Sequence, residues 1–244
     1  MDAIKFLYRI VLVLLTMISG VASLSSQELN NRLLNRPYTD FRPWHLGFSV
    51  GVHTLDFNFT HNGYVTADGE SWFMEQPDFS PGFCVNGLVD LRLNTYFSVR
   101  FSPGMYFGNR TVRMRDANND SWERQDIKSN MVVLPVDLKF ASLRYHNYRP
   151  YLVAGMMATI DVSKSRPREM LQLKSTDFLL SAGFGCDFYL SYFKLCPEVK
   201  FCFGLTDVLK HNRPDFDENP DGMKFTQSLK KVTTQMVVLT FYFE

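Results

Sequence analysis

The chain has 244 residues, of which 45% are hydrophobic and 15% aromatic, including 22 Phe and 11 Tyr. This length suits one all-β domain of ordinary size. The 26 basic residues nearly balance the 25 acidic ones, so the composition gives no indication of nucleic acid as a partner.

The first 22 residues have the three parts of a secretory signal peptide. Lys5 and Arg9 form a basic start, residues 10–18 form an apolar core, and residues 20–22 offer small side chains for cleavage. The apolar run is too short to cross a bilayer comfortably as a helix. We therefore expect residues 1–22 to direct export. Residues 23–44, which are polar and contain two prolines, should form a flexible segment in the periplasm.

Alternation of apolar and polar residues with a period of two predicts strands along the rest of the chain. The clearest case is residues 83–108, where two such runs meet at a two-residue turn and predict a hairpin. Asp90, Arg92 and Arg100 lie on its polar face, and a soluble protein rarely turns such charges into its core. An apolar outside and a polar inside is the pattern of a membrane β-barrel.

The same alternation predicts eight strands. They are residues 45–59, 83–93, 97–107, 130–142, 150–161, 177–190, 194–204 and 232–243. In the first, the parity of the apolar residues changes near His53 and Thr54, which indicates a bulge or the point where the strand leaves the membrane.

The lengths of the connections alternate. Long ones at residues 60–81, 110–129, 162–176 and 206–231 alternate with short ones at 94–95, 143–149 and 191–193. We predict an all-β fold, an eight-stranded antiparallel up-and-down transmembrane β-barrel of outer-membrane type, over residues 45–244. A soluble lipocalin-like barrel is disfavoured, because apolar alternation recurs on nearly every strand with Gly and Ser inward on several.

Eight charged residues fall on the inward face of the predicted strands, four of each sign. They are Asp90, Arg92, Arg100, Asp137, Lys139, Asp187, Glu198 and Lys200. The interior of an eight-stranded barrel is filled by side chains, and a charge left unpaired there is strongly destabilising. We expect a lumen plugged by a structural ion-pair network. A path for protons or ions is the less favoured alternative.

No combination of residues predicts a catalytic, cofactor-binding or metal site. The cysteines are not spaced for a metal and are difficult to pair as disulfides across the predicted strands, so we expect small packing side chains. The histidines show no metal-ligand spacing, and most fall in predicted loops or turns. These residues are Cys84, Cys186, Cys196, Cys202, His45, His53, His61, His146 and His211. We expect no cofactor.

Two acidic segments, residues 116–120 and 215–222, carry alternating oxygen ligands of the calcium-loop kind. Both lack the glycine at the sixth position and the glutamate at the twelfth, so solvated turns are the favoured interpretation. No GxSxG-type nucleophile elbow occurs. We expect a protein that is not an enzyme and has no small-molecule substrate. A barrel enzyme acting on lipid is the minor alternative.

From residue 35 onward the sequence carries a set of residues that resembles a known family. They are Asn35, Pro37, Asp40, His45, Gly47, Phe48, Gly51, Asp56 and Phe57. Their order resembles the start of the barrel in the PorT family of Bacteroidetes, although Arg36 stands where that family has an apolar residue. Residues 87–108 and 134–140 also look like the barrel core of that family.

The resemblance implies a role in the type IX secretion system, which exports proteins across the outer membrane. PorT-like proteins are needed for this export but are not known as its conduit, which suits a plugged lumen. The expected partners are the outer-membrane bilayer and other secretion-system components. The alternative is a generic small outer-membrane barrel that serves adhesion, immune evasion or envelope integrity.

Overall fold

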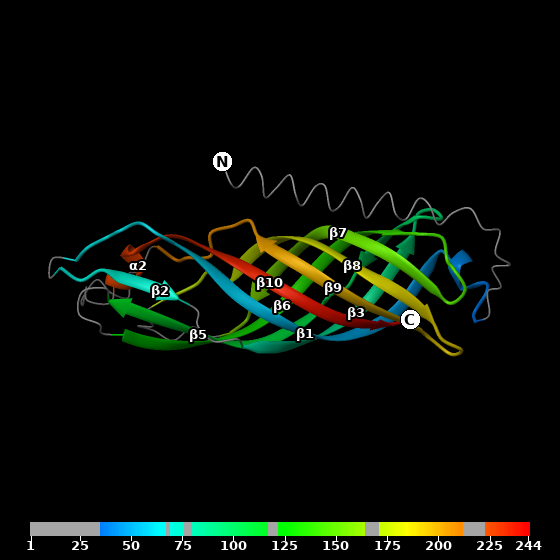
Figure 1. Cartoon of the computed structure of the whole chain (residues 1–244), viewed down its shortest axis with the longest axis horizontal. Coiled ribbons are helices and arrows are strands. Elements are labelled where there is room, and N and C mark those ends of the chain that lie inside the picture. The colour runs from blue at the N-terminus through cyan, green and yellow to red at the C-terminus, as the bar shows by residue number, and fades with distance from the viewer. Residues whose placement is uncertain (1–34, 67–68, 76–79, 117–121, 164–170, 212–222) are drawn as a thin grey trace. The chain divides into compact units, whose positions relative to one another are not determined.

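The computed structural model describes residues 35–66, 69–75, 80–116, 122–163, 171–211 and 223–244. Within them the chain forms one antiparallel sheet of ten strands (Figure 1). The strands are β1 (Trp44–His61), β2 (Trp72–Glu75), β3 (Pro81–Arg92), β4 (Phe97–Phe101), β5 (Gly104–Asp116), β6 (Trp122–Ala141), β7 (Tyr148–Asp161), β8 (Thr176–Tyr189), β9 (Lys194–Gly204) and β10 (Leu229–Phe243). The predicted signal peptide, residues 1–22, lies outside the described residues.

Two short helices accompany the strands in this part of the chain. The 3-10 helix η1 (Thr39–Phe41) precedes β1, and α2 (Met223–Gln227) precedes β10. Among the described residues, no helix is long and apolar enough to cross a bilayer.

The sheet closes on itself. β4 and β5 occupy one place in the ring, because both pair with β3 and with β6. They are interrupted at Pro103, which has no amide hydrogen to donate but still accepts a bond from Gly87 N at 2.8 Å. Since β1 pairs with both β3 and β10, eight strands form a closed ring, and β2 adds to β5. The predicted eight-stranded, antiparallel, up-and-down barrel is confirmed.

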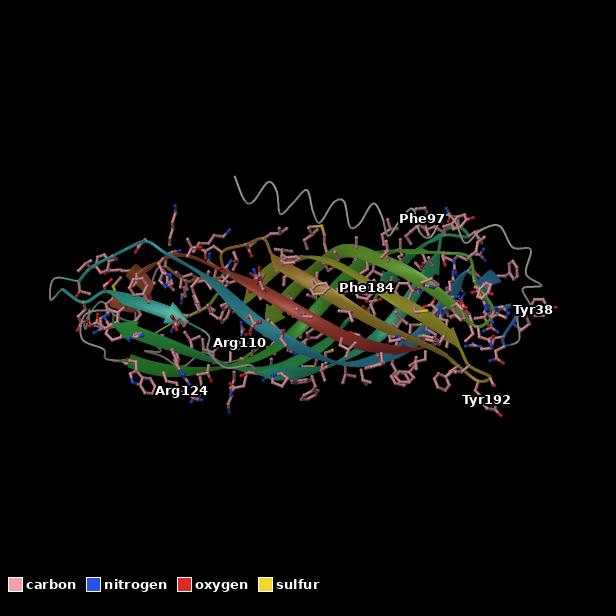
Figure 2. All side chains as sticks on the ribbon, in the orientation of Figure 1. Tyr38, Phe97, Arg110, Arg124, Phe184 and Tyr192 are labelled. Atoms are coloured by element: carbon pink, nitrogen blue, oxygen red, sulfur yellow. The ribbon has the colours of Figure 1, made fainter. Side chains whose placement is uncertain are left out.

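The outward face of the barrel carries a belt of exposed apolar side chains. On β1 it includes Leu46 and Phe48, which are 58% and 55% exposed, and on β8 it includes Phe184 at 55% (Figure 2). Stacked pairs across neighbouring strands, such as Phe48 with Phe243 at 5.1 Å, make the belt continuous from strand to strand. A belt of this kind is the lipid-facing surface of a membrane barrel. We call this part the membrane half; it runs from residues 44–52 of β1 to residues 237–243 of β10.

The predicted bulge at His53 and Thr54 is wrong. β1 pairs with β10 in one register from Phe48↔Phe243 to Thr60↔Lys231, and the shift comes only between Thr60 and His61. The side chains that point inward simply change from polar to apolar along the strand, because β1 continues beyond the apolar belt. The other interpretation of the parity change, a strand leaving the membrane, agrees with this geometry.

Beyond the belt the strands continue as an extension that has an ordinary hydrophobic core. The extension comprises β2, α2, residues 54–61 of β1, 109–116 of β5, 122–129 of β6 and 229–235 of β10. Its buried core residues are Phe57, Trp72, Met74, Val112, Met114, Leu171, Val208, Leu209, Phe225, Leu229 and Val232. Figure 1 shows β2, α2 and the end of β5 together at one end of the barrel.

Three of the predicted long loops are therefore partly wrong. Residues 110–129, predicted as a charged loop, are mostly β5 and β6, which stay paired as far as Arg115↔Trp122. Residues 60–81 contain β2, and residues 206–231 contain α2 and the start of β10. The physical reason is the same in each case. A few inward apolar residues are enough to hold strands whose outward residues are charged and face water.

Candidate functional site

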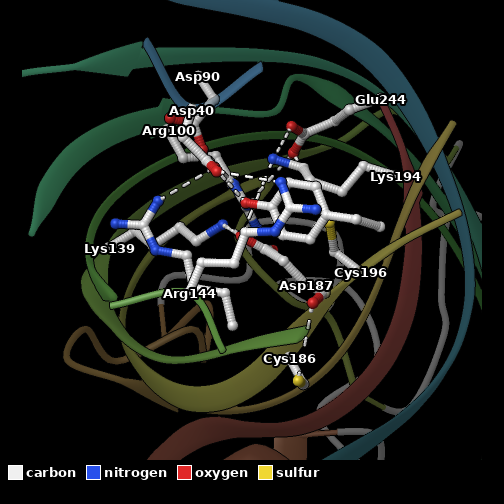
Figure 3. A network of polar contacts seen from close by, with 12 residues as sticks. Asp40, Asp90, Arg100, Lys139, Arg144, Cys186, Asp187, Lys194, Cys196 and Glu244 are labelled. Atoms are coloured by element: carbon white, nitrogen blue, oxygen red, sulfur yellow. Dashed lines mark hydrogen bonds and ion pairs between the residues drawn. The ribbon is translucent and has the colours of Figure 1, made fainter. Parts of the chain in front are cut away.

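The lumen of the membrane half is filled by charged side chains centred on Arg100 of β4 (Figure 3). Its guanidinium lies 2.8 Å from Glu198, 3.3 Å from Asp90 and 3.6 Å from Glu244. The Tyr242 ring lies 4.5 Å from the guanidinium carbon, in a cation–π contact. The Arg100 side chain is completely buried, so this charge is held by protein groups alone.

Three lysines complete the network. Lys139 lies 2.8 Å from Asp187. Lys200 lies 2.5 Å from Asp137 and 3.3 Å from Glu198. Lys194 of β9 lies 3.9 Å from Asp187 and pairs closely with Glu244. Each cation thus contacts at least one carboxylate, which is the condition for keeping charges buried in a barrel.

The eight charges predicted to face the lumen do not all join this network. Seven of them take part in the ion pairs just described. Arg92 does not, because it is the last residue of β3 and lies at the mouth of the barrel. There it donates hydrogen bonds to the carbonyls of Asp40 and Asn94 and lies 5.7 Å from the Phe41 ring.

Two members of the network were not among the predicted residues. Lys194 lies on the same face of β9 as Glu198 and Lys200, so its parity was the signal that could have identified it. Glu244 follows the outward-facing Phe243, and its side chain reaches back into the lumen to Arg100 and Lys194. With them the network has four cations and five carboxylates.

The mouth of the barrel is crossed by residues 35–41, which we call the latch. Arg144, in the turn after β6, donates to the carbonyls of Asn35 and Arg36 and to the Asp40 carboxylate at 3.2 Å. The guanidinium of Arg144 also stacks on the Tyr189 ring at 3.6 Å, and the Tyr189 hydroxyl donates to Asp40. The latch is thereby tied to two separate parts of the barrel rim, the turn after β6 and the end of β8.

The latch is also tied at its start. Asn35 donates twice, from its backbone N–H to Asn147 Oδ1 at 3.1 Å and from its side-chain amide to the Tyr189 carbonyl at 2.9 Å. The Arg36 guanidinium donates to the Glu244 carbonyl at 2.9 Å. A cavity of about 30 Å³ remains between the latch and the luminal charges, enough for one or two water molecules.

On the other side of the network an apolar layer closes the lumen. Its buried members are Leu55, Cys84, Tyr106, Met131, Val133, Met157, Leu179, Cys202, Met236 and Val238. Latch, ion-pair network and apolar layer follow one another along the barrel axis. Arg100, Asp137 and Glu198 are at most 1% exposed, so no solvent-accessible channel runs past their side chains.

The cysteines and histidines have structural surroundings. Cys84, Cys196 and Cys202 are buried, Cys186 is half-buried, and all four are free thiols. His53 stacks on Tyr106 at 5.0 Å. In the part of the chain that the structure describes, no group of three or more His, Cys, Asp or Glu could hold a metal ion.

The two acidic segments predicted as solvated turns lie almost wholly outside the described residues. Only Asp116 is placed. It is buried and accepts a hydrogen bond from Ser71 N at 3.0 Å.

Comparison with known families matches residues 25–210 to the model of an outer membrane protein beta-barrel domain. A search of curated proteins finds no match to the chain. The matched span covers the latch and most of the apolar belt and of the luminal network.

Proposed function

This chain belongs to the outer membrane protein beta-barrel domain family, and from that premise we propose that it is a non-enzymatic accessory or assembly component of type IX protein secretion. The barrel is embedded in the outer membrane, as family membership implies. Its proposed task is to support the export apparatus and not to conduct cargo.

The observation that carries this proposal is the closed lumen. An extended polypeptide needs a water-filled path, whereas the Arg100 and Asp137 side chains are completely buried. Opening such a path would require the buried ion pairs centred on Arg100 to separate. A barrel closed in this way acts through its surfaces.

The residues that resemble the PorT family support the same proposal, because the geometry gives several of them a role. Asn35 and Asp40 hold the latch on the barrel mouth. Gly47 and Gly51 lie on the closing seam between β1 and β10. A Cβ there would lie 2.1 Å from the Phe243 carbonyl oxygen and 2.5 Å from that of Leu239. These positions serve barrel closure, which a secretion accessory of that family would share.

The proposal includes an orientation. Outer-membrane barrels have short periplasmic turns and longer connections outside. The short turns here follow β3, β6 and β8, at the same end as the latch. We therefore assign the latch to the periplasm and the extension to the cell exterior. The periplasmic rim around the latch is where other secretion components would bind.

A deletion strain tests the proposal. Cargo that carries the sorting domain should accumulate unprocessed in the periplasm, while the envelope stays intact. The plasmid-borne gene should restore export. The Asp40→Ala variant, which loosens the latch, should restore it poorly. Its matched control, Asp126→Ala, removes an exposed carboxylate of the extension and should restore export fully. Normal export in the deletion strain would overturn the secretion role.

One observation favours a second function. The extension presents an exposed, preorganised surface outside the membrane, as a generic barrel for adhesion, immune evasion or envelope integrity would. This alternative predicts that the deletion strain exports cargo normally but shows a fragile envelope or reduced adhesion.

A further inference from the structure

Three strands at the tip of the extension form a sheet that is buried on one face only. It consists of β2, residues 109–116 of β5 and residues 122–128 of β6, and we call it the tip ribbon. Its inner face packs Trp72, Met74 and Met114 into the core of the extension. The inner packing fixes the strands that carry the outer side chains.

The outer face of the tip ribbon is basic and aromatic. Phe73, Arg115 and Trp122 stand side by side on β2, β5 and β6, and Phe73 and Trp122 are 43% and 65% exposed. Glu75, Arg113 and Arg124 form the next row. Figure 2 shows Arg124 at this end of the molecule. A hollow of about 300 Å³ is lined by Glu75, Arg113, Arg115 and Trp122.

A second hollow lies on the same outer side, where the apolar belt ends. It has a volume of about 360 Å³ and is apolar on one side and polar on the other. Phe83 and Phe107, stacked at 4.9 Å, form the apolar side. Asn109, Lys128 and Asn130 form the polar side.

The two hollows follow one another along β5, starting from the edge of the apolar belt. Outward residues of β5 run from Phe107, in the belt, through Asn109 to Arg113 and Arg115. At about 3.3 Å per residue, and with the usual tilt of barrel strands, Arg113 lies about 15 Å above Phe107. This is the height of phosphorylated headgroups and their first sugars, and the ribbon faces sideways towards them.

We propose that these two hollows bind one phosphorylated glycolipid of the outer leaflet, and this inference rests on the orientation proposed above. The junction of acyl chains and headgroup lies over Phe83 and Phe107, with Lys128 on a phosphate. A sugar ring packs against the Trp122 indole beside the Arg113 guanidinium, which lies 5.9 Å from the ring centroid, and Arg113 and Arg115 bind a further phosphate or carboxylate. Arginine suits planar, bidentate recognition of such groups.

The charges on the ribbon favour an anionic ligand. Its outward cations are Arg113, Arg115, Arg124 and Lys128, and its outward carboxylates are Glu75 and Asp126. Arg124 carries the same charge on the same face of the ribbon but does not line either hollow. Arg124 is therefore the control for Arg113 and Arg115, because changing it alters the charge of the ribbon and leaves both hollows intact.

Native mass spectrometry of the full chain in detergent tests the proposal. The probe is rough-type lipopolysaccharide, which consists of lipid A and inner-core sugars, and phosphatidylcholine is the neutral comparison. We expect saturable binding of the lipopolysaccharide alone. Binding should weaken at least tenfold in the double variant Arg113→Gln/Arg115→Gln and in Trp122→Ala. It should weaken severalfold in Lys128→Gln and stay unchanged in Arg124→Gln.

Each variant is first checked for the heat-dependent shift in electrophoretic mobility that marks a folded barrel. Binding that falls as far in Arg124→Gln as in the double variant would overturn the proposal, because general charge would then explain it. Equal binding of dephosphorylated lipopolysaccharide would also overturn the proposal. So would a polyglutamate peptide that binds more tightly than the rough-type lipopolysaccharide and displaces it. This readout uses purified protein, so it stands or fails separately from the secretion role.

Discussion

Along β1 the inward side chains are Ser49 and His53 in the membrane half and Leu55 and Phe57 in the extension, although one register with β10 runs through all four. The outward side chains change in the opposite sense, from Phe48 to Asn58. The backbone of β1 therefore keeps the same strand pairing in both regions, and only the medium around the barrel differs. Where lipid surrounds the barrel, paired charges fill the lumen on the latch side and the apolar layer fills the rest. Where water surrounds it, the core is mainly apolar, although Arg110 is buried there against the Phe57 ring.

The two regions should consequently respond differently to the same kind of change. In the membrane half the inside is held by paired charges. Loss of one partner strongly destabilises the fold, because the other charge is left buried and unpaired. In the extension the inside is held by apolar packing, and the outside carries ion pairs that water screens.

Removing the central cation of the network has the largest expected effect. Arg100→Met leaves the Asp90, Glu198 and Glu244 carboxylates without their shared partner, and we expect a loss of about 3–5 kcal/mol of unfolding free energy. The comparable change in the extension, Arg124→Met, removes an ion pair whose side chains are about half exposed and should cost less than about 1 kcal/mol. Urea unfolding of the refolded barrels measures both, and equal losses would contradict the comparison.

Truncating the core of the extension comes next. Met114 is fully buried there, and Met114→Ala should lower the local stability of the extension by about 2–5 kcal/mol. The membrane half should be unaffected, because the ion-pair network makes no contact with this core. Hydrogen exchange resolved by segment measures the effect. Faster exchange in β2 and in residues 109–116, with unchanged exchange in residues 44–52, is expected; uniform acceleration would show that the two regions unfold as one.

Acid should weaken the extension through Asp207, by a smaller amount. Burial raises the pKa of this carboxyl, but hydrogen bonds from Val232 N, the His211 ring and Leu209 N outweigh it and leave the pKa below its usual range. A lowered folded-state pKa stabilises the fold above the unfolded value of about 3.9, and this contribution is lost as the pH falls through the folded value.

The Asp207 contribution should be about 1 kcal/mol, since the side chain is partly exposed. Protease susceptibility of the chain near residue 207, followed from pH 6 to pH 3, measures it. Asp207→Asn should remove most of the acid dependence; an unchanged profile in that variant would assign the effect to another group.

The barrel and most of the luminal charges could be predicted from the sequence, because strand alternation is a property of neighbouring residues. Asp137 and Lys139 sit on one strand at a spacing of two, so strand parity alone predicts that they point the same way. Parity could not predict that Arg92 lies at the rim, since that depends on where the membrane half ends. Nor could it predict the role of Glu244, which reaches its partners from beyond the last strand.

The extension and the latch were harder to predict because their signals are not local. In residues 110–116 two inward apolar side chains, Val112 and Met114, alternate with arginines, and this composition is also typical of a solvated loop. Only the distant partners Trp72 and Phe225 make a core of them. Likewise, Asp40 lies in a polar segment that precedes every strand, and its partners are Arg144 and Tyr189.

The most direct test of the central claim is a spin-label scan along β1. In a full chain with its four cysteines replaced, single labels are placed at positions 48, 50 and 52, at 54, 56 and 58, and at 49, 53 and 57. Labels at 48–52 should be accessible to oxygen dissolved in lipid, those at 54–58 to a water-soluble nickel chelate, and the inward set to neither. A chelate signal at position 49 would mean an open lumen. An accessible label at position 53 together with a protected label at position 54 would mean a bulge there. Either result would contradict the account.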